Sequence, residues 1–112
     1  MCGIIGYVGT NEAADIVLDA LRRLEYRGYD SSGIATIDNG SLRVSRAVGK
    51  LKMLTAQLAK APLSGSISIG HTRWATHGGV KEMNAHPHTA NNSVAIVHNG
   101  IIENYGDIKA RL

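Results

Sequence analysis

The spacing of apolar residues in the first half of the chain predicts a strand, a helix and a hairpin. Gly3–Val8 is a short apolar run interrupted by glycine, which is typical of a buried strand. Between about residues 11 and 25 the apolar residues share one helical face, as in an amphipathic helix. Two further apolar runs, 33–37 and 42–45, flank Asp38-Asn39-Gly40, a turn signal that predicts a β-hairpin.

The second half of the chain has weaker patterns. Leucines at helical spacing predict a short helix from Leu51 that ends before Pro62. Apolar runs at 67–69 and 93–97 predict two more strands. The polar, glycine-containing stretch 71–92 lies between them without a clear period, so we expect a loop there.

The order of these elements indicates the fold class. A final segment, 103–112, is predicted to open a helix. Strands and helices are mixed without strict alternation, which favours an α+β fold over a doubly wound sheet. At 112 residues the chain has room for one hydrophobic core, and we expect one domain over residues 1–112.

Composition and charge limit the classes of partner. Hydrophobic residues make up 44% and charged residues 19%, an ordinary balance for a soluble globular protein. The net charge of +3 comes from scattered basic residues, with Arg22-Arg23 the one adjacent pair, so we expect no nucleic-acid contact. No apolar stretch approaches the ~18 residues that span a bilayer, and no signal peptide is evident, so we expect a cytoplasmic protein without a membrane segment.

The single cysteine, Cys2, follows the initiator methionine and cannot form an internal disulfide. A thiol has a pKa of ~8.5 and a chain-terminal amine ~7.7–8.0, so the two exchange a proton readily near neutral pH. If Met1 is removed, Cys2 can be a nucleophile whose own α-amine is the base. On position alone, an inert cysteine near the start of a strand is the commoner situation.

Polar groups suited to a small ligand gather in the stretch that begins at His71. Arg73 offers a planar fork for an α-carboxylate. Thr76 and His77 add hydroxyl, imidazole and backbone donors, and Gly78-Gly79 allows close approach of the backbone. The alternative is a surface loop with a solvated arginine and a packed tryptophan.

The Asn99-Gly100 pair has two interpretations. Asn-Gly between apolar runs is first of all a hairpin turn signal. The alternative is an oxyanion hole, in which the Asn99 side chain and the Gly100 backbone N–H stabilise a tetrahedral intermediate.

Five histidines raise the question of a metal site; they are His71, His77, His86, His88 and His98. His86 and His88 are close in sequence, but no carboxylate or thiol completes a recognised ligand spacing. We therefore predict no metal, and expect the histidines to be hydrogen-bonding loop residues.

Five segments together resemble the glutaminase domains of class II glutamine amidotransferases, above all those of the glutamine–fructose-6-phosphate aminotransferase family. These segments are Met1–Gly6, Leu21–Ser31, His71–Gly78, Asn84–His88 and Val97–Asn104. The first motif is shared by other class II amidotransferases, whereas Leu21–Ser31 and His71–Gly78 are narrower signals. The resemblance covers nearly the whole chain.

This resemblance implies an N-terminal-nucleophile hydrolase fold, an α/β/β/α sandwich that is incomplete in this chain. Carried over by position, Cys2 is the nucleophile and supplies its own base, while Asn99 and Gly100 form the oxyanion hole. No cofactor is implied.

The same resemblance assigns the substrate-binding residues. Arg73 holds the glutamine carboxylate, and Thr76 and His77 line the same pocket. Trp74 helps to close the loop over the substrate. Arg27-Gly28 orients the catalytic terminus.

For the whole enzyme, the resemblance implies that ammonia from glutamine converts fructose 6-phosphate to glucosamine 6-phosphate in a homo-oligomer. The sugar-phosphate isomerase domain and a later acidic segment of the glutaminase domain have no counterpart here. We therefore expect residues 1–112 alone to hydrolyse glutamine poorly and to make no glucosamine 6-phosphate. The rival hypothesis is a non-catalytic module whose exposed sheet edges bind a partner or a second copy.

Overall fold

The structure, a computed structural model, describes residues 3–24, 31–73, 85–91, 93–98 and 105–111. In chain order the elements are β1 (Gly3–Val8), α1 (Ala13–Leu24), β2 (Ser31–Asp38), β3 (Ser41–Val48), α2 (Leu51–Lys60), β4 (Ile67–Arg73), β5 (His88–Ala90), β6 (Val94–Ile96) and α3 (Tyr105–Arg111). The predicted strands and helices are all present, and most differ from their predicted bounds by a few residues.

The four longer strands form one antiparallel sheet in the order β1-β4-β2-β3, and β5 pairs with β6 in a second, two-stranded sheet. The β2–β3 hairpin closes at Asn39 and Gly40, whose φ angles are 51° and 80°. Two left-handed residues in a two-residue turn match the right-handed twist of the flanking strands. The predicted hairpin is therefore confirmed, and its strands are longer than predicted.

Strand β4 corrects the prediction of a loop from 71 to 92. The strand continues to Arg73, and His88–Ala90 forms β5, so the predicted loop is wrong at both ends. Of the three polar residues that end β4, His71 and Thr72 are paired with β1 on one side and β2 on the other, and Arg73 is paired with β2. This pairing is between segments far apart in sequence, which local polarity does not reveal.

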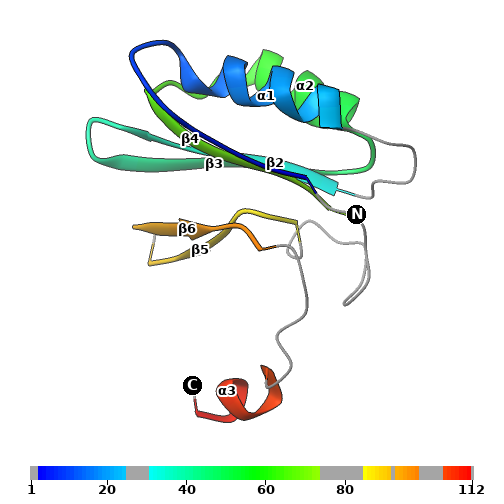
Figure 1. The fold of residues 1–112 in the computed structure, drawn as a ribbon, viewed down its shortest axis with the longest axis vertical. Helices are drawn as coiled ribbons and strands as arrows, with labels where there is room; N and C mark the ends of the chain where they lie inside the picture. The colour runs from blue at the N-terminus through cyan, green and yellow to red at the C-terminus, as the bar shows by residue number, and fades with distance from the viewer. Residues whose placement is uncertain (1–2, 25–30, 74–84, 92, 99–104, 112) are drawn as a thin grey trace.

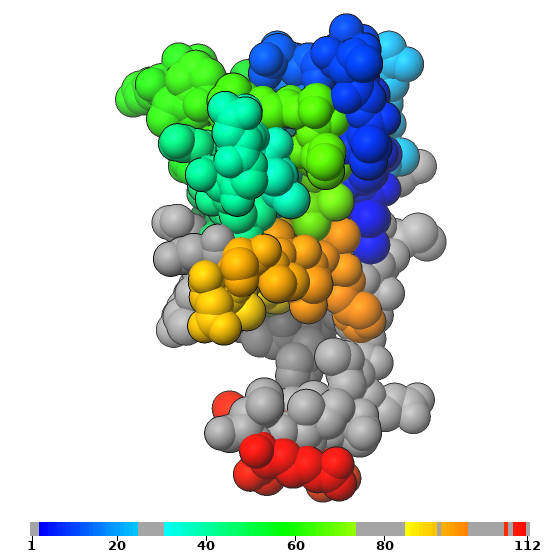
Figure 2. All heavy atoms as spheres, turned by 90° about the vertical axis from the view of Figure 1, so that its left-hand side faces the viewer, coloured from blue at the N-terminus to red at the C-terminus, as the bar shows by residue number. Residues whose placement is uncertain are grey.

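Helices α1 and α2 cover one face of the four-stranded sheet, and the β5–β6 pair lies on the other side (Figure 1). Figure 2, turned by 90°, shows the same succession of layers, with α3 beyond the β5–β6 pair at the C-terminal end. The layers follow in the order helices, sheet, second sheet. This arrangement confirms the α+β class.

The core lies between the helices and the sheet. Its fully buried members include Val17 and Leu21 from α1, Ile34 from β2 and Leu54 from α2. Gly70 of β4 lets α1 approach closely, because a Cβ there would collide with Val17. The helical stripe predicted from the sequence is thus the face that covers the sheet.

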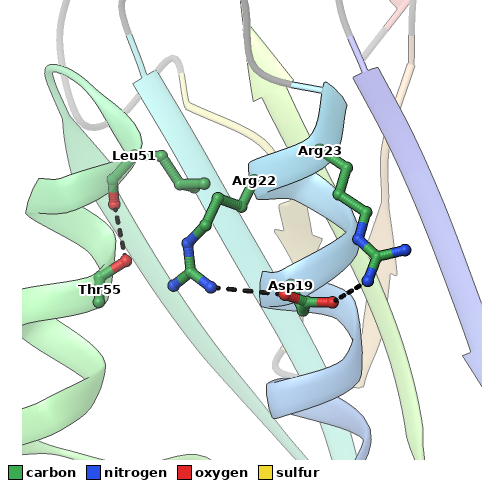
Figure 3. Close-up of polar contacts among 5 residues, drawn as sticks. All are labelled: Asp19, Arg22, Arg23, Leu51 and Thr55. Atoms are coloured by element: carbon green, nitrogen blue, oxygen red, sulfur yellow. Dashed lines mark hydrogen bonds and ion pairs between the residues drawn. The ribbon is translucent and has the colours of Figure 1, made fainter.

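The solvent side of α1 carries two exposed ion pairs (Figure 3). Asp19 lies 3.5 Å from Arg22 and 3.3 Å from Arg23. Exposed pairs of this kind contribute about 0–1 kcal/mol to stability, so the helix is held mainly by its buried face.

Within the described residues, no helix has the length and apolar character needed to cross a membrane.

Candidate active site

Three consecutive buried polar residues end strand β4: His71 and Thr72 are fully buried, and Arg73 is 6% exposed. Residues that alternate along a strand point to opposite faces. Thr72 lies on the α1 side, whereas His71 lies on the side of the β5–β6 pair. The end of β4 therefore presents polar groups in both directions.

Thr72 holds the first residue of strand β1 in place. The backbone N–H of Gly3 donates a hydrogen bond to Thr72 Oγ1 at 3.2 Å, and the two residues are paired in the sheet. A Cβ on Gly3 would lie 2.8 Å from Thr72 Oγ1 and 3.3 Å from Leu24. Glycine is therefore required at the residue that follows Cys2 in the sequence.

His71 and His86 hold the backbone of His98 between them. His71 Nε2 is 3.0 Å from the carbonyl oxygen of His98, and the N–H of His98 donates to His86 Nδ1 at 3.3 Å. The rings of His71 and His86 stack, with centroids 4.1 Å apart and planes inclined by 23°. The ring of His88 also lies near that of His86, with centroids 4.2 Å apart and planes inclined by 51°.

Gly33 makes this arrangement possible. It pairs with His71 across the β2–β4 interface, and a Cβ on Gly33 would collide with the carbonyl oxygen of His86. The backbone of His86 thus lies directly on strand β2, which brings its ring to the side of His71.

Burial keeps these imidazoles neutral. Removal from water lowers the pKa of His71 to about 4 and that of His86 to about 3. Arg73 and the neighbouring histidines contribute to the lowering of both pKa values, while the hydrogen bond to His98 opposes it at His71. Burial, together with Arg46 and Arg73, also lowers the pKa of His88. Near pH 7 the group is therefore uncharged.

The histidines do not form a metal site among the residues that the structure describes. No set of three or more potential ligand side chains is placed to share an ion. Two of the rings stack face to face, a contact typical of packing and hydrogen bonding.

A cavity of about 110 Å³ between β4 and β6 lies away from these groups. Its lining includes Ile37 and Ile67, which pair at the opposite end of β4 from Arg73. The candidate site is therefore the end of β4 at which β1 begins.

Comparison with known proteins finds relatives that match the whole of this chain. The chain is 58% identical over 112 residues to glutamine–fructose-6-phosphate aminotransferase [isomerizing] of Mesorhizobium japonicum, and 60% identical over the same length to that of Brucella suis. The enzyme of Thermus thermophilus is 55% identical over 113 residues. Each match covers 100% of this chain. Over its whole length, the chain is thus similar to one part of this aminotransferase.

The chain corresponds to the N-terminal region of these aminotransferases, and it spans 18–19% of their length. No family model matches it. Among solved structures, it is similar to a glutamine phosphoribosylpyrophosphate amidotransferase from B. subtilis complexed with ADP and GMP. The TM-score is 0.82 at 28% identity, over 99% of this chain and 24% of that one. This likeness confirms the predicted N-terminal-nucleophile hydrolase fold.

Of the residues that the family resemblance assigns to the site, Arg73 is described, and it is buried at the end of β4. The others lie outside the described residues: Cys2, Arg27, Gly28, Trp74, Thr76, His77, Asn99 and Gly100. Their immediate neighbours Gly3 and His98 are described. Both are hydrogen-bonded to consecutive residues of β4, namely Thr72 and His71.

The sequence reasoning did not find the supporting roles of Thr72, His71 and His86. It treated the histidines as loop residues, whereas His71 lies in a strand. No local signal extended the strand, because Gly70 interrupts the alternation that begins at Ile67 and the three residues after it are all polar.

Proposed function

We propose that this chain is the N-terminal part of a glutaminase domain that hydrolyses glutamine to glutamate and ammonia. Cys2, freed of Met1, attacks the side-chain carboxamide, and its α-amine accepts the thiol proton. Asn99 and Gly100 stabilise the oxyanion of the tetrahedral intermediate, and ammonia leaves as the thioester forms. Water then hydrolyses the thioester to glutamate.

One observation carries the proposal: consecutive residues of β4 bind the backbone beside both halves of the proposed machinery. Thr72 accepts from Gly3, next to Cys2, and His71 contacts the carbonyl of His98, next to Asn99. Arg73 follows directly in the same strand. A nucleophile, its oxyanion donors and a carboxylate-binding arginine need this kind of proximity on rigid elements.

The substrate-binding roles follow from the same location. The Arg73 guanidinium suits the α-carboxylate of glutamine, because its planar fork pairs with two oxygens at once. Trp74, Thr76 and His77 follow in sequence and complete the pocket. Arg27-Gly28 orients the catalytic terminus.

For the protein as a whole, we propose that the ammonia converts fructose 6-phosphate to glucosamine 6-phosphate, which agrees with the name of its relatives, glutamine–fructose-6-phosphate aminotransferase. A sugar-phosphate isomerase domain would accept it. We also propose a cytoplasmic location and a homo-oligomer.

The test is covalent labelling of the intact protein that carries this sequence. After incubation with the electrophilic glutamine analogue 6-diazo-5-oxo-L-norleucine, mass spectrometry should find one adduct, on Cys2, in molecules that have lost Met1. Excess glutamine should slow the labelling, and glutamate should be released from glutamine.

Matched controls are Cys2→Ser, which removes the thiol, and Arg73→Lys, which keeps a charge without the planar fork. Cys2→Ser should abolish labelling, and Arg73→Lys should raise KM at least tenfold. A retained Met1, or a thiol that the analogue never labels, would support the non-catalytic module instead.

A further inference from the structure

We propose that His71 and His86 are positioning residues, which clamp the backbone of His98 from both sides and thereby set the geometry of the oxyanion hole at Asn99-Gly100. This inference rests on the proposed function. It assigns a role to two side chains that the chemistry itself does not use.

The two hydrogen bonds fix successive peptide units. The N–H of His98 belongs to the peptide bond with Val97, and it is bound by His86 Nδ1 at 3.3 Å. The carbonyl of His98 belongs to the peptide bond with Asn99, and it is bound by His71 Nε2 at 3.0 Å. Because each peptide unit is planar, the second contact sets the plane that also carries the Asn99 N–H.

The peptide unit that the His71 contact fixes joins His98 to Asn99, and the next peptide unit, which joins Asn99 to Gly100, carries the Gly100 N–H. Only the two backbone angles of Asn99 separate these units. A tilt of the His98 carbonyl turns the N–H end of Asn99 with it, and so changes the starting geometry from which both proposed donors are placed. Oxyanion donors act only when they are held within hydrogen-bond distance of the developing charge, so such a tilt lowers the rate of the chemical step.

The clamp requires a specific proton arrangement. A carbonyl oxygen accepts, so His71 must carry its proton on Nε2, and His86 Nδ1 must be bare to accept from an N–H. Both rings are then neutral with the proton on Nε2. His71 Nδ1 is buried and, within the described part of the chain, has no hydrogen-bond partner. The absence of an acceptor beside it agrees with a nitrogen that carries no proton.

The surroundings favour that neutral state. The charges of His88 from β5, Arg73 from β4 and His98 disfavour a positive charge on both rings, although the hydrogen bond to the His98 carbonyl favours it at His71. Burial acts in the same direction, and the pKa values of about 4 and about 3 keep both imidazoles uncharged near pH 7.

The clamp is also built into the sheet. His71 is paired between β1 and β2, and the backbone of His86 rests on Gly33 of β2. Both side chains therefore start from fixed backbone, and their stacked rings restrict one another. A pair of mobile surface histidines would not have this rigidity.

The experiment compares variants that keep or remove each contact in the intact protein. His71→Gln keeps a donor near the position of Nε2, and His71→Leu removes it. His86→Asn keeps an acceptor near the position of Nδ1, and His86→Leu removes it. We expect the leucine variants to lower kcat for glutamine hydrolysis about tenfold to hundredfold, with KM within about threefold of the parent, and the amide variants to recover most of the loss.

A second readout separates this inference from the proposed function. Alkylation of Cys2 by iodoacetamide is a direct displacement that forms no oxyanion, so its rate should stay within about twofold in all four variants. If the parent protein neither alkylates at Cys2 nor hydrolyses glutamine, the proposed function fails. If the parent is active and the leucine variants keep its kcat, the clamp is wrong and the proposed function stands.

A spectroscopic measurement on the unmodified protein tests the inference even if some variants do not fold. The ¹⁵N shifts of the ring nitrogens should show a protonated Nε2 and a bare Nδ1 for both His71 and His86 at pH 7. A proton on Nδ1 of His86 would overturn the inference without any substitution.

Discussion

Gly33 permits a close backbone contact between β2 and the segment that leads into β5. A Cβ there meets the carbonyl oxygen of His86, which is backbone and cannot turn aside. We expect Gly33→Ala to lower the free energy of unfolding by about 1–3 kcal/mol, the usual cost of overpacking. Gly6→Ala is the matched control, because a Cβ at Gly6 has no atom within 4 Å. Urea denaturation followed by circular dichroism measures both, and equal effects would contradict the close approach.

Thr72 offers a substitution that removes one hydrogen bond and almost no volume. Thr72→Val leaves the Gly3 N–H without its acceptor, whereas Thr72→Ser keeps a hydroxyl. A neutral hydrogen bond contributes about 1 kcal/mol, so we expect Thr72→Val to reduce glutamine hydrolysis about fivefold by loosening the catalytic terminus. Steady-state kinetics of the intact protein measures this. A serine variant as impaired as the valine variant would mean that the methyl group, not the hydroxyl, matters.

His71 and His86 should make stability depend on pH. Their pKa values in the folded protein, about 4 and about 3, lie below the ordinary histidine value of 6.5, so between these pH values the unfolded chain binds more protons than the folded one. Stability is therefore full above about pH 6.5 and falls as the pH drops toward 4, by up to about 1.4 kcal/mol per pH unit for each histidine. Urea midpoints from pH 7.5 to 4.5 measure the slope.

The control for this pH dependence is the double variant His71→Gln, His86→Asn, which lacks both ionisable rings. Its urea midpoint should fall less steeply over the same range, where carboxylates also begin to titrate. Parallel curves for the two proteins would show that the histidines are not the cause.

Among the elements, α1 shows how unevenly stability is distributed over a helix. Leu21 is fully buried against the sheet, whereas Asp19 is half exposed and makes two surface ion pairs (Figure 3). We expect Leu21→Ala to cost about 2–5 kcal/mol through lost packing and a residual cavity. Asp19→Ala should cost about 0–1 kcal/mol. Chemical denaturation of both variants tests this. A larger loss of stability from Asp19→Ala than from Leu21→Ala would mean that the surface ion pairs, not the buried face, hold the helix.

The elements also show which structure the sequence could predict. The helices and the β2–β3 hairpin have local signals: an apolar stripe, and a turn in which Asn39 and Gly40 adopt positive φ. The polar end of β4 has none, because its partners are Gly3, Ile4 and Ser31–Gly33, distant in sequence. Arg73 was assigned to the site from chemistry and resemblance, yet its strand, and the support from Thr72 and His71, depend on pairing that only the folded sheet supplies.

For the molecule as a whole, the two sheets should differ in how readily they open. Strands β2 and β4 are paired on both sides and covered by helices, whereas in the described structure β5 and β6 pair only with each other. A two-stranded sheet is marginal in isolation, and Val94 and Ile96 of β6 are 54% and 57% exposed.

We therefore expect amide hydrogen exchange in the 112-residue chain to be slowest in β2 and β4 and fastest, among the strands, in β5 and β6. Peptide-level mass spectrometry over minutes to hours would resolve the two groups. Since β6 leads into His98, opening of this pair would also release the clamp of His71 and His86, so Gly33→Ala should speed exchange in β5 and β6 more than in β2. Uniform protection across both sheets would mean that the second sheet is as firmly held as the first, and that the His98 backbone is fixed by more than these two histidines.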